Sequence, residues 1–596
     1  MTTDQAIVFS LLFGTLVLFI IGKWRYDVVA ILALLVATIA GVVPADQAFS
    51  GFGHPAVVTV AAILVVSRGL LNSGLIDSIA KAMLKIGNRH TLQVAALTGL
   101  VIVCSAFMNN TGALVILLPV AVRMAGNNDR APSYLLMPLA FGSLLGGMLT
   151  LIGTPPNIII AAFRAETGSV PFRMFDFAPV GLGIAAVGLL FIALIGWRLI
   201  PRRRGEASTE ELFQIKEYIT EVKIPADSPF VGKRLQGMEE IEDSEIAVVS
   251  LVRGDYHMPA PSPIETLQAG DVVIVEADTD SLKKLLANAR VELAEAKPAA
   301  ETELASTEVS VMEAVVMPNS PLEGNTAWTV RLRWRYGINL LGVARYGTRL
   351  IQRIRQIQLQ IGDVLLLQGR SEVLLQALPV LGCLPLRGRD LRLGEPRRII
   401  VAVGIFATAV MATALGGFPV QITFSGAAVA MTLVRLVPLR ELYQSIDWPV
   451  IVLLGAMIPV GEALETTGGA ELLVSGVRPM AAYLPPTSIL AIVLIGTICL
   501  SSIINNAAAA VLMAPIASSI ATGLRASADP FLMAVAVGAS SAFLTPIAHQ
   551  SNALVMGPGG YHFGDYWRLG LPLVILTVLV AVPLIIWVWP LEAAAH

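Results

Sequence analysis

Two asparagine pairs stand inside strongly apolar stretches that lie almost four hundred residues apart. Asn109 and Asn110 lie within FMNNTGALVILLPVA, and Asn505 and Asn506 lie within IINNAAAAVLMAPIA. Amide side chains are costly to bury in apolar surroundings unless they find partners, so each pair indicates a polar site. The repetition indicates an ancestral unit that was duplicated. Such a duplication inside a membrane is how secondary transporters build a central binding site.

A helix-breaking segment follows the first pair. In LTLIGTPPN, which ends at Asn157, one Gly and two Pro interrupt a long apolar run, and proline cannot continue a helix without losing a hydrogen bond. In hydrocarbon, a broken helix survives only where it lines a protein-enclosed cavity or an ion site. The carbonyls that the break frees can bind a cation, and the positive N-terminal ends of half-helices can face an anion. A kinked helix without a ligand is the alternative for this segment taken alone.

The composition predicts the membrane scaffold that such segments need. Of the 596 residues, 55% are hydrophobic and only 14% are charged, and the mean hydropathy is +0.73. Soluble domains carry about a quarter of charged residues. Apolar runs that reach the roughly 20 residues of a membrane span are predicted near 5–21, 27–43, 55–73, 133–163 and 178–198, and again near 398–415, 420–437, 449–466, 530–557 and 569–590. The sequence thus predicts an all-α polytopic membrane protein whose N-terminal segment is a first span and not a cleaved signal.

The two series of spans form an internal repeat. Asn109 and Asn505 lie 396 residues apart, Pro55 and Pro449 lie 394 apart, and LTLIGTPPN matches LTPIAHQSN at 395. Between the third and fourth spans of each series lies a further apolar segment of about thirty residues, 92–123 and 488–524, with the asparagine pair near its middle. Because this exceeds the length that one straight span needs, we predict a re-entrant helical hairpin in each half; one straight helix is the alternative.

Five spans and one hairpin in each half would orient the two halves oppositely, as an inverted repeat. The positive-inside rule supports this arrangement, because most basic residues of the short loops fall on one side, predicted to be cytoplasmic. Arg164, Arg173 and Arg525 are the exceptions. Both termini are then predicted to be periplasmic or extracellular, in a bacterial inner membrane. The residues on the cytoplasmic side are Lys23, Arg25, Lys81, Lys85, Arg89, Arg123, Arg130, Arg202 to Arg204, Arg397, Arg398, Arg435 and Arg440.

A polar insert separates the halves and is itself a tandem repeat. Ser228-Pro229 and Gly270-Asp271 recur 92 residues later as Ser320-Pro321 and Gly362-Asp363. Short strand-like runs, a Gly-Asp turn, a buried strand and a helix predict two small α/β modules joined by the linker EAKPAAETELASTE. The predicted domains are membrane repeat 1 (1–200), module 1 (205–295), module 2 (300–390) and membrane repeat 2 (397–596).

Other residue patterns limit the function further. Cys104, Cys383 and Cys499 are widely separated and fit neither a metal spacing nor a disulfide framework. The net charge of −2, with charges concentrated in residues 202–398, disfavours nucleic acid as a partner. The sequence has no G-x-x-x-x-G-K-[ST] run, which disfavours transport driven by ATP.

Two charged residues occupy equivalent places inside the predicted spans. Arg68 and Glu462 each stand thirteen residues after a matched proline, Pro55 and Pro449. Such charges usually face a partner or a cavity, or else reach the membrane interface with their long side chains. A structural role is favoured for both. Asp27 begins a span close to Arg25 and is expected at the interface.

These motifs resemble those of a known family of transporters. Asn109-Asn110-Thr111 resembles the Ser-Asn-Thr tip motif of the divalent anion:sodium symporter family, and GTPPN resembles its broken-helix motif. The resemblance covers roughly residues 1–200 and 398–596. It implies no catalytic residues, but an elevator-type homodimer in the lipid membrane, in which each protomer carries a dianion such as succinate, citrate or sulfate together with Na⁺.

The resemblance also implies ligands by position. The anion would contact Asn110, Thr111 and Asn506. One sodium ion would be held by Ser105, Asn109, Asn110 and the carbonyl of Gly153, and a second by Ser501, Asn506 and the carbonyl near Ala548.

Two departures from the family pattern bear on the anion. Ala507 stands where the family has a second tip hydroxyl, and His549, Gln550 and Ser551 stand where Thr-Pro-Pro would be. Unequal tips favour a compact or one-headed anion, so sulfate is the leading candidate. His549 could donate to a sulfate oxygen or accept a coupling proton; the alternative is a core histidine bonded to a neighbouring carbonyl.

Alternative functions stay open. A dicarboxylate or sulfonate carrier is the alternative within transport, and a regulated anion channel is the alternative of another class. A cation:proton antiporter would need carboxylates near the breaks, and none stands there. The two modules resemble the C-terminal ligand-binding modules of potassium-conductance regulators (RCK-C type), which implies a small-molecule regulator; a purely architectural role is the alternative.

Overall fold

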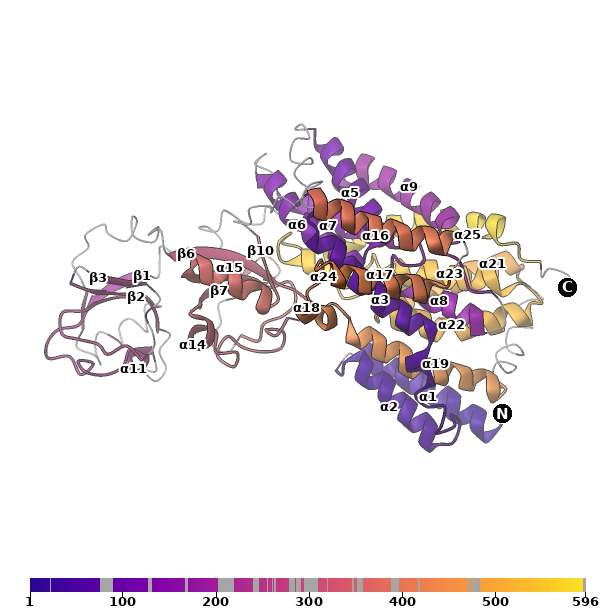
Figure 1. Ribbon diagram of the computed structural model, residues 1–596, viewed down its shortest axis with the longest axis horizontal. Coiled ribbons are helices and arrows are strands. Elements are labelled where there is room, and N and C mark those ends of the chain that lie inside the picture. The colour runs from indigo at the N-terminus through magenta and orange to yellow at the C-terminus, as the bar shows by residue number, and fades with distance from the viewer. Residues whose placement is uncertain are drawn as a thin grey trace.

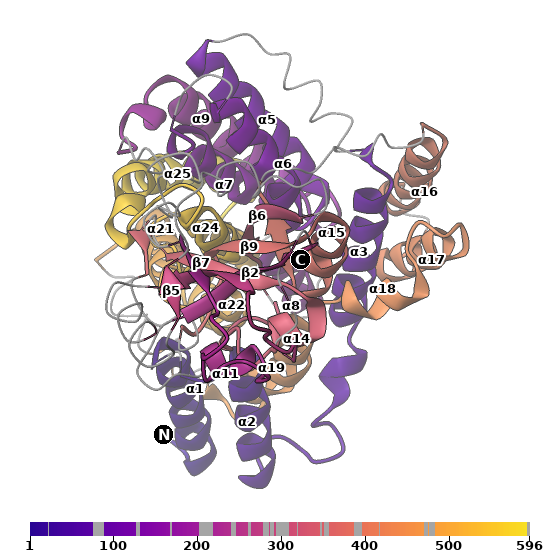
Figure 2. The same ribbon diagram turned by 90° about the vertical axis from the view of Figure 1, so that its left-hand side faces the viewer.

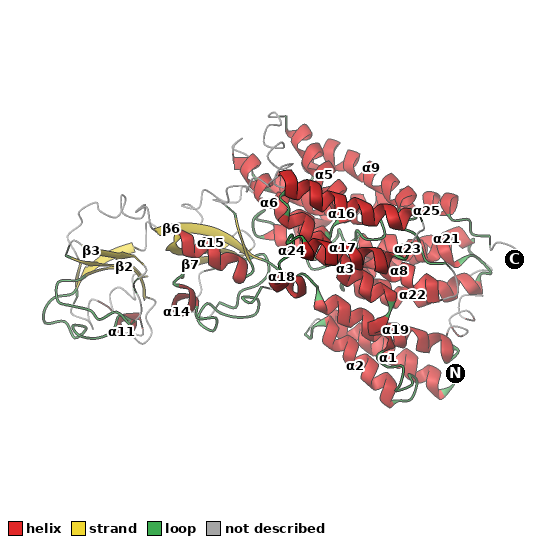
Figure 3. Cartoon of the chain, viewed as in Figure 1, coloured by secondary structure: helices red, strands yellow, loops and turns green. Residues whose placement is uncertain are grey.

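The computed structural model describes residues 1–21, 23–75, 89–126, 131–166, 170–201, most of 219–293 and of 309–386, and then 396–415, 418–469 and 483–592. Helices gather in one body, and two small sheets extend from it in a row (Figure 1, Figure 3). Several predicted features lie outside the described residues: Lys81, Lys85, Arg130, Arg202 to Arg204 and the linker between the modules.

Helices form where the hydropathy predicts spans. In the first half they are α1 (Thr3–Ile21), α2 (Tyr26–Ile39), α3 (Pro55–Asn72), α5 (His90–Phe107), α6 (Asn110–Gly126), α7 (Ser133–Gly147), α8 (Pro155–Glu166) and α9 (Ala178–Leu194). In the second half they are α16 (Pro396–Ala414), α17 (Val420–Leu433), α18 (Leu439–Gln444), α19 (Trp448–Thr466), α21 (Pro486–Ser501), α22 (Asn506–Gly523), α23 (Ala528–Ser540), α24 (Gln550–Met556) and α25 (Tyr566–Val588). Within the described part of the chain, six helices have the length and the apolar composition to cross a membrane.

The helices are interrupted at the predicted motifs. α5 ends at Phe107 and α6 begins at Asn110, and α21 ends at Ser501 and α22 begins at Asn506. A single straight helix through either asparagine pair is therefore excluded. The LTLIGTPPN segment is non-helical over residues 148–154, and its counterpart in the second half is non-helical over 541–549.

The two halves interdigitate. α19 packs on α2, and α17 packs on α3. The broken helices also cross between the halves, because α22 contacts α8 while α24 contacts α6 and α7. Figure 2 shows α22 and α24 of the second half beside α6, α7 and α8 of the first. Elements of the two halves that are separated by more than three hundred residues are therefore in contact.

The insert forms two five-stranded sheets with the same strand order. The first contains β1 (Ile219–Lys223), β2 (Ile246–Arg253), β3 (Tyr256–Pro259), β4 (Val272–Ala277) and β5 (Glu292–Leu293), in the order β3-β2-β4-β1-β5. The second contains β6 (Val309–Val316), β7 (Asn339–Arg345), β8 (Thr348–Arg349), β9 (Val364–Arg370) and β10 (Cys383–Pro385), in the corresponding order β8-β7-β9-β6-β10. All these pairings are antiparallel. As the sequence predicts, β9 follows the Gly362-Asp363 turn and leads into α15 (Ser371–Val380).

The matched turns of the two modules have the same geometry. Gly270 and Gly362 have φ values of +90° and +84°, which side chains rarely tolerate. Asp271 accepts hydrogen bonds from Arg253 at 2.9 Å, and Asp363 accepts them from Arg345 at 2.7 Å. Both carboxylates are 1% exposed. The tandem repeat in sequence is therefore a tandem repeat in structure.

Candidate functional site

The first asparagine of each pair caps the helix that follows. Asn109 Oδ1 accepts a hydrogen bond from Thr111 N at 3.2 Å, and Asn505 Oδ1 accepts one from Ala507 N at 2.9 Å. This satisfies one of the backbone donors that a helix N-terminus leaves without a partner. The cap explains why each helix begins directly after its first asparagine. Asn109 was expected as a sodium ligand, and its side-chain oxygen is engaged in this cap.

The second asparagine of the first pair lies in a cluster of oxygen atoms. Asn110 is 2% exposed, and its Oδ1 lies 2.6 Å from Ser105 Oγ, 3.0 Å from Ser143 O and 3.2 Å from Gly153 O. Ser105 Oγ also donates to Ser143 O at 2.7 Å. The structure therefore brings together three of the predicted groups, namely Ser105, Asn110 and the Gly153 carbonyl. The Ser143 carbonyl joins them, and no sequence motif marked it.

The orientation of the Asn110 amide decides what this cluster can hold. With the oxygen directed inward, Asn110 faces the carbonyls of Ser143 and Gly153, which are acceptors like itself. A hard cation satisfies such a set of uncharged oxygens. Rotating the amide by 180° lets its nitrogen donate to the same three oxygens. The cluster can thus be closed either by a cation or by the amide itself.

Two glycines make room for the cluster. A Cβ atom on Gly147 would lie 2.5 Å from Asn110 Oδ1, and one on Gly153 would lie 2.5 Å from Gly147 O. Both distances are far shorter than a van der Waals contact. The glycine of GTPPN is therefore required by the close approach of backbone and side chain, as well as by the break in the helix.

A third asparagine holds the break together. Asn157 Nδ2 donates to Gly147 O at 3.2 Å and to Thr150 O at 2.8 Å, and Thr150 Oγ1 donates to Ala106 O. These bonds join the two sides of the break and tie it to the end of α5. They satisfy carbonyls that a broken helix leaves without N–H partners.

The second half repeats these bonds at offsets of 395 and 396 residues. Asn552 Nδ2 donates to Ala542 O at 2.7 Å and to Thr545 O at 3.1 Å. Thr545 Oγ1 donates to Ser502 O at 2.7 Å, and Ser501 Oγ donates to Ala539 O at 2.6 Å. The scaffold of the two breaks is therefore the same.

In the second half, Asn506 and His549 both accept hydrogen bonds from backbone N–H groups. Asn506, which is 5% exposed, uses its Oδ1 to accept from Ala507 N at 2.8 Å. In the orientation that satisfies both ends of the Asn110 amide, its nitrogen points to Ser105 Oγ and its oxygen faces the opposite way. His549 caps α24, and its Nδ1 accepts from Ser551 N at 3.0 Å. Nδ1 therefore bonds a backbone N–H, which leaves Nε2 as the nitrogen that could donate to an anion or to a carbonyl.

Two hydroxyls near the breaks were not singled out as ligands from the sequence. Thr154 Oγ1 and Ser551 Oγ are buried and have no hydrogen-bond partner among the described residues. Thr154 directly precedes α8, and Ser551 lies in the first turn of α24. The sequence marks these two residues as candidate ligands only by their position beside the helix breaks. Polar atoms of this kind are available to a ligand.

The charged residues singled out from the sequence lie away from this cluster. Arg68 pairs with Glu441 at 3.0 Å, and 44% of its side chain is exposed. Glu462 is also exposed. Arg25 pairs with Asp27 at 3.0 Å in the α1–α2 loop and the start of α2. These contacts are consistent with structural roles.

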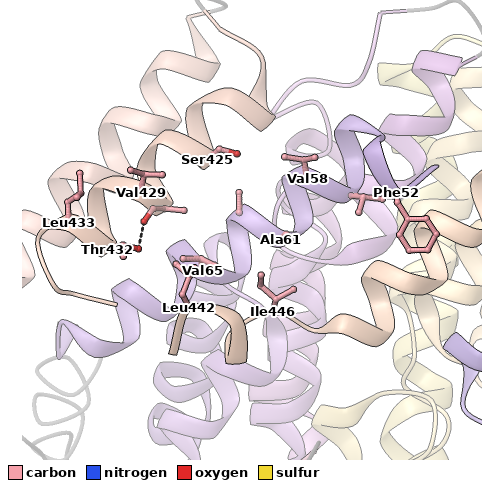
Figure 4. Close-up of a pocket in the computed structure, with 13 residues that line it drawn as sticks. Phe52, Val58, Ala61, Val65, Ser425, Val429, Thr432, Leu433, Leu442 and Ile446 are labelled. Atoms are coloured by element: carbon pink, nitrogen blue, oxygen red, sulfur yellow. Dashed lines mark hydrogen bonds between the residues drawn. The ribbon is translucent and has the colours of Figure 1, made fainter. Parts of the chain in front are cut away.

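A separate cavity of about 490 Å³ lies between α3 and α17 (Figure 4). Its lining is almost wholly apolar, with Val58, Val65 and Val429 among the residues, and Ser425 and Thr432 as polar members. It has no charged or amide group, so it is not an anion site. The broken helices are the candidate site.

Comparison with known proteins gives concordant matches. The profile of the citrate transporter family matches residues 16–538 and 485–594. An uncharacterized transporter of Synechocystis is 33% identical over 585 residues, which cover 96% of this chain and 95% of that protein. An uncharacterized transporter of Escherichia coli is 30% identical over 611 residues, 98% of this chain and 99% of that protein. Sodium/sulfate cotransporter 1 of Chlamydomonas reinhardtii is 26% identical over 360 residues, 56% of this chain and 40% of that protein.

Proposed function

The chain belongs to the citrate transporter family, and on that premise we propose that it is a sodium-coupled symporter of a small divalent anion, with sulfate as the first candidate. It is an integral membrane transporter and not an enzyme. The observation that carries the proposal is the cluster of Ser105 Oγ, Ser143 O and Gly153 O around the Asn110 amide, beside a helix break. The Chlamydomonas relative is named a sodium/sulfate cotransporter, which supports sodium as the coupling ion and sulfate as the anion.

The first sodium ion is bound by Ser105, Asn110 and the Gly153 carbonyl. The Ser143 carbonyl is the added ligand that the geometry supports. When the Asn110 oxygen points to the cation, its amide nitrogen points the other way and can donate to an anion. One side chain then contacts both solutes. This gives a direct reason why anion binding would depend on sodium.

The second sodium ion is bound by Ser501, Asn506 and the carbonyl near Ala548. The Asn506 amide has to turn away from Ala507 N to reach it. Because the bond that it gives up is replaced by a bond to the cation, this site is expected to be weaker than the first. The two sites would therefore fill in order.

The anion lies between the two tips, in contact with Asn110, Thr111, Asn506, Ala507 and His549. The N-termini of α6, α8 and α22 supply partial positive charge there. Because His549 Nδ1 accepts a hydrogen bond, the proton of the neutral imidazole is on Nε2, which can donate to an anion oxygen. Ala507 offers no hydroxyl, which favours a one-headed anion over a long dicarboxylate.

Transport proceeds by alternating access of an elevator type in a homodimer, with the halves as an inverted repeat and the asparagine pairs at the tips of re-entrant hairpins. The contacts of α24 with α6 and of α22 with α8 support a single moving unit built from both halves. The two modules, of RCK-C type, lie in the cytoplasm of a bacterial cell, and the termini lie outside it. Sodium binding orders the tips so that the anion meets a preformed site.

The experiment is uptake of radiolabelled sulfate into proteoliposomes with and without an inward sodium gradient. We expect uptake only with sodium, and loss of that uptake in Asn110→Ala and Asn506→Ala. Competition by unlabelled citrate, succinate or taurine tests the alternatives, and the description of the family makes citrate the most informative competitor. Flux that follows voltage without sodium would instead indicate an anion channel.

A further inference from the structure

The second sheet has two buried faces that pack against different partners. Leu365 and Leu367 of β9 point into the core of the module itself, whereas Val364 and Leu366 belong to the apolar cluster of the membrane helices. Side chains alternate between the faces of a strand, so one face is the module's own core and the other is a docking face. The docking face is at most 9% exposed and contains Val315, Leu341, Ala344, Val364, Leu366 and Leu384.

The turn that begins β9 rests on the end of α24. A Cβ on Gly362 would lie 2.5 Å from Ala553 O, and a Cβ on Gly557 would overlap Gly362 O and lie 3.4 Å from Val364 Cγ2. Backbone therefore packs on backbone, without side chains that could slide or rearrange. Asp363 is fixed by Arg345, which holds the turn in this position. Figure 1 shows this module beside α24, whereas the first module lies farther out.

The first module is a natural control for this contact. Its turn has the same ion pair and the same positive φ at Gly270, but a Cβ on Gly270 would meet nothing within 4 Å. On β1, Lys223 stands where β6 has Val315, and Glu292 of β5 is its cross-strand neighbour, where β10 has Leu384. Lys223 is exposed. The exposed Lys223 keeps its position on the first sheet in water, whereas the apolar pair attaches the second sheet to the helices.

The docked helix is short and carries the proposed anion site at its other end. α24 spans Gln550–Met556, so about 12 Å separates His549 from the contact at Gly557. The module also reaches a different group of helices. Glu323 of the module raises the pKa of Arg25 in the α1–α2 loop, in addition to the larger effect of the hydrogen bond from Arg25 to Asp27. The module thus lies close enough to the α1–α2 loop for an electrostatic interaction with Arg25.

We propose that the second module is a clamp that restrains α24 and slows transport until its docking face is released. This inference rests on the proposed function, because alternating access requires the helices that carry the anion site to move relative to the others. Such a movement must break the backbone contact at Gly362 and expose the apolar docking face. A signal that separates the module from α24 would therefore activate the transporter.

The test uses the full-length protein and two ways of releasing the clamp. The double variant Val315→Lys/Leu384→Glu gives the second sheet the pair that the first sheet already carries, so the module keeps a composition compatible with folding in water. Gly362→Val pushes the turn from α24 by steric overlap. The control is Gly270→Val, which introduces the same strain at a turn with open space around it.

Two measurements separate docking from transport. Hydrogen–deuterium exchange of the amides in residues 553–561 reports docking, and the initial rate of sodium-driven sulfate uptake reports the restraint. We expect about a tenfold faster exchange and a severalfold faster uptake in both release variants, and neither change in Gly270→Val. Unchanged exchange, faster exchange with unchanged or slower uptake, or equal effects in the control would each overturn the clamp. Absence of uptake in the wild type would refute the proposed function, whereas the exchange comparison would still decide whether the module docks.

Discussion

Asn157 and Asn552 close the two helix breaks with the same pair of hydrogen bonds. Each side-chain amide donates to the backbone carbonyls that lie ten and seven residues earlier in the chain. Both residues are at most 1% exposed. The two halves differ at their tips, where the first has Thr111 and the second has Ala507, but they share this pair of hydrogen bonds. The fold therefore separates a constant part, which maintains each break, from a variable part at the tips, which is proposed to contact the solutes.

Replacing Asn157 or Asn552 by leucine tests the structural role of the hydrogen bonds that close each helix break. Asn157→Leu and Asn552→Leu each leave two buried carbonyls without a partner, at a cost of roughly 1–3 kcal/mol per carbonyl. We expect both variants to melt at a lower temperature in detergent, by similar amounts. The check is the thermal unfolding of the two purified variants beside the wild type. A large loss in only one of them would show that the breaks are not equivalent.

Removal of one oxygen of the cluster tests the first sodium site. Ser105→Ala deletes a hydroxyl that lies 2.6 Å from Asn110 Oδ1. We expect the apparent sodium affinity to fall roughly tenfold, the equivalent of about 1.4 kcal/mol, with a smaller change in the affinity for the anion. The measurement is the sodium dependence of the uptake rate. Ser519→Ala is the control, because Ser519 Oγ bonds only to Pro515 O of its own helix in the described structure, and an equal loss there would argue against the assignment.

Much of this site could be predicted from the sequence, because proline, glycine and paired asparagines have strong local effects. The four helix breaks follow from such local rules, whereas the grouping of Ser105, Asn110 and Gly153 is implied only by the resemblance to the symporter family. The capping role of His549 could not be predicted, because it depends on the orientation of one side chain. The pairing of Arg68 with Glu441 and the contact of Gly362 with Gly557 join segments far apart in the chain. No periodicity within a single segment encodes such tertiary contacts.

A methyl group at Gly147 tests whether the cluster must be open. In Gly147→Ala the new Cβ would lie 2.5 Å from Asn110 Oδ1, so the Asn110 amide has to move from its present place. We expect sodium to stabilise this variant much less than it stabilises the wild type, as measured by the sodium-dependent shift of the melting temperature. Gly404→Ala on α16 has open space around the new atom and should keep the full shift. A full shift in Gly147→Ala would contradict a cation ligand at Asn110.

The two roles of His549 can be separated with a substitution that keeps only one of them. Asparagine is a good helix cap, so His549→Asn should preserve the bond to Ser551 N that Nδ1 now makes. It removes the Nε2–H group that is proposed to contact the anion. We therefore expect normal melting behaviour and a several-fold higher KM for sulfate, whereas His549→Ala should lose both the cap and the anion contact. Unchanged KM values in His549→Asn would assign this histidine to capping alone, and the anion would then have to be held by the amides and helix ends without it.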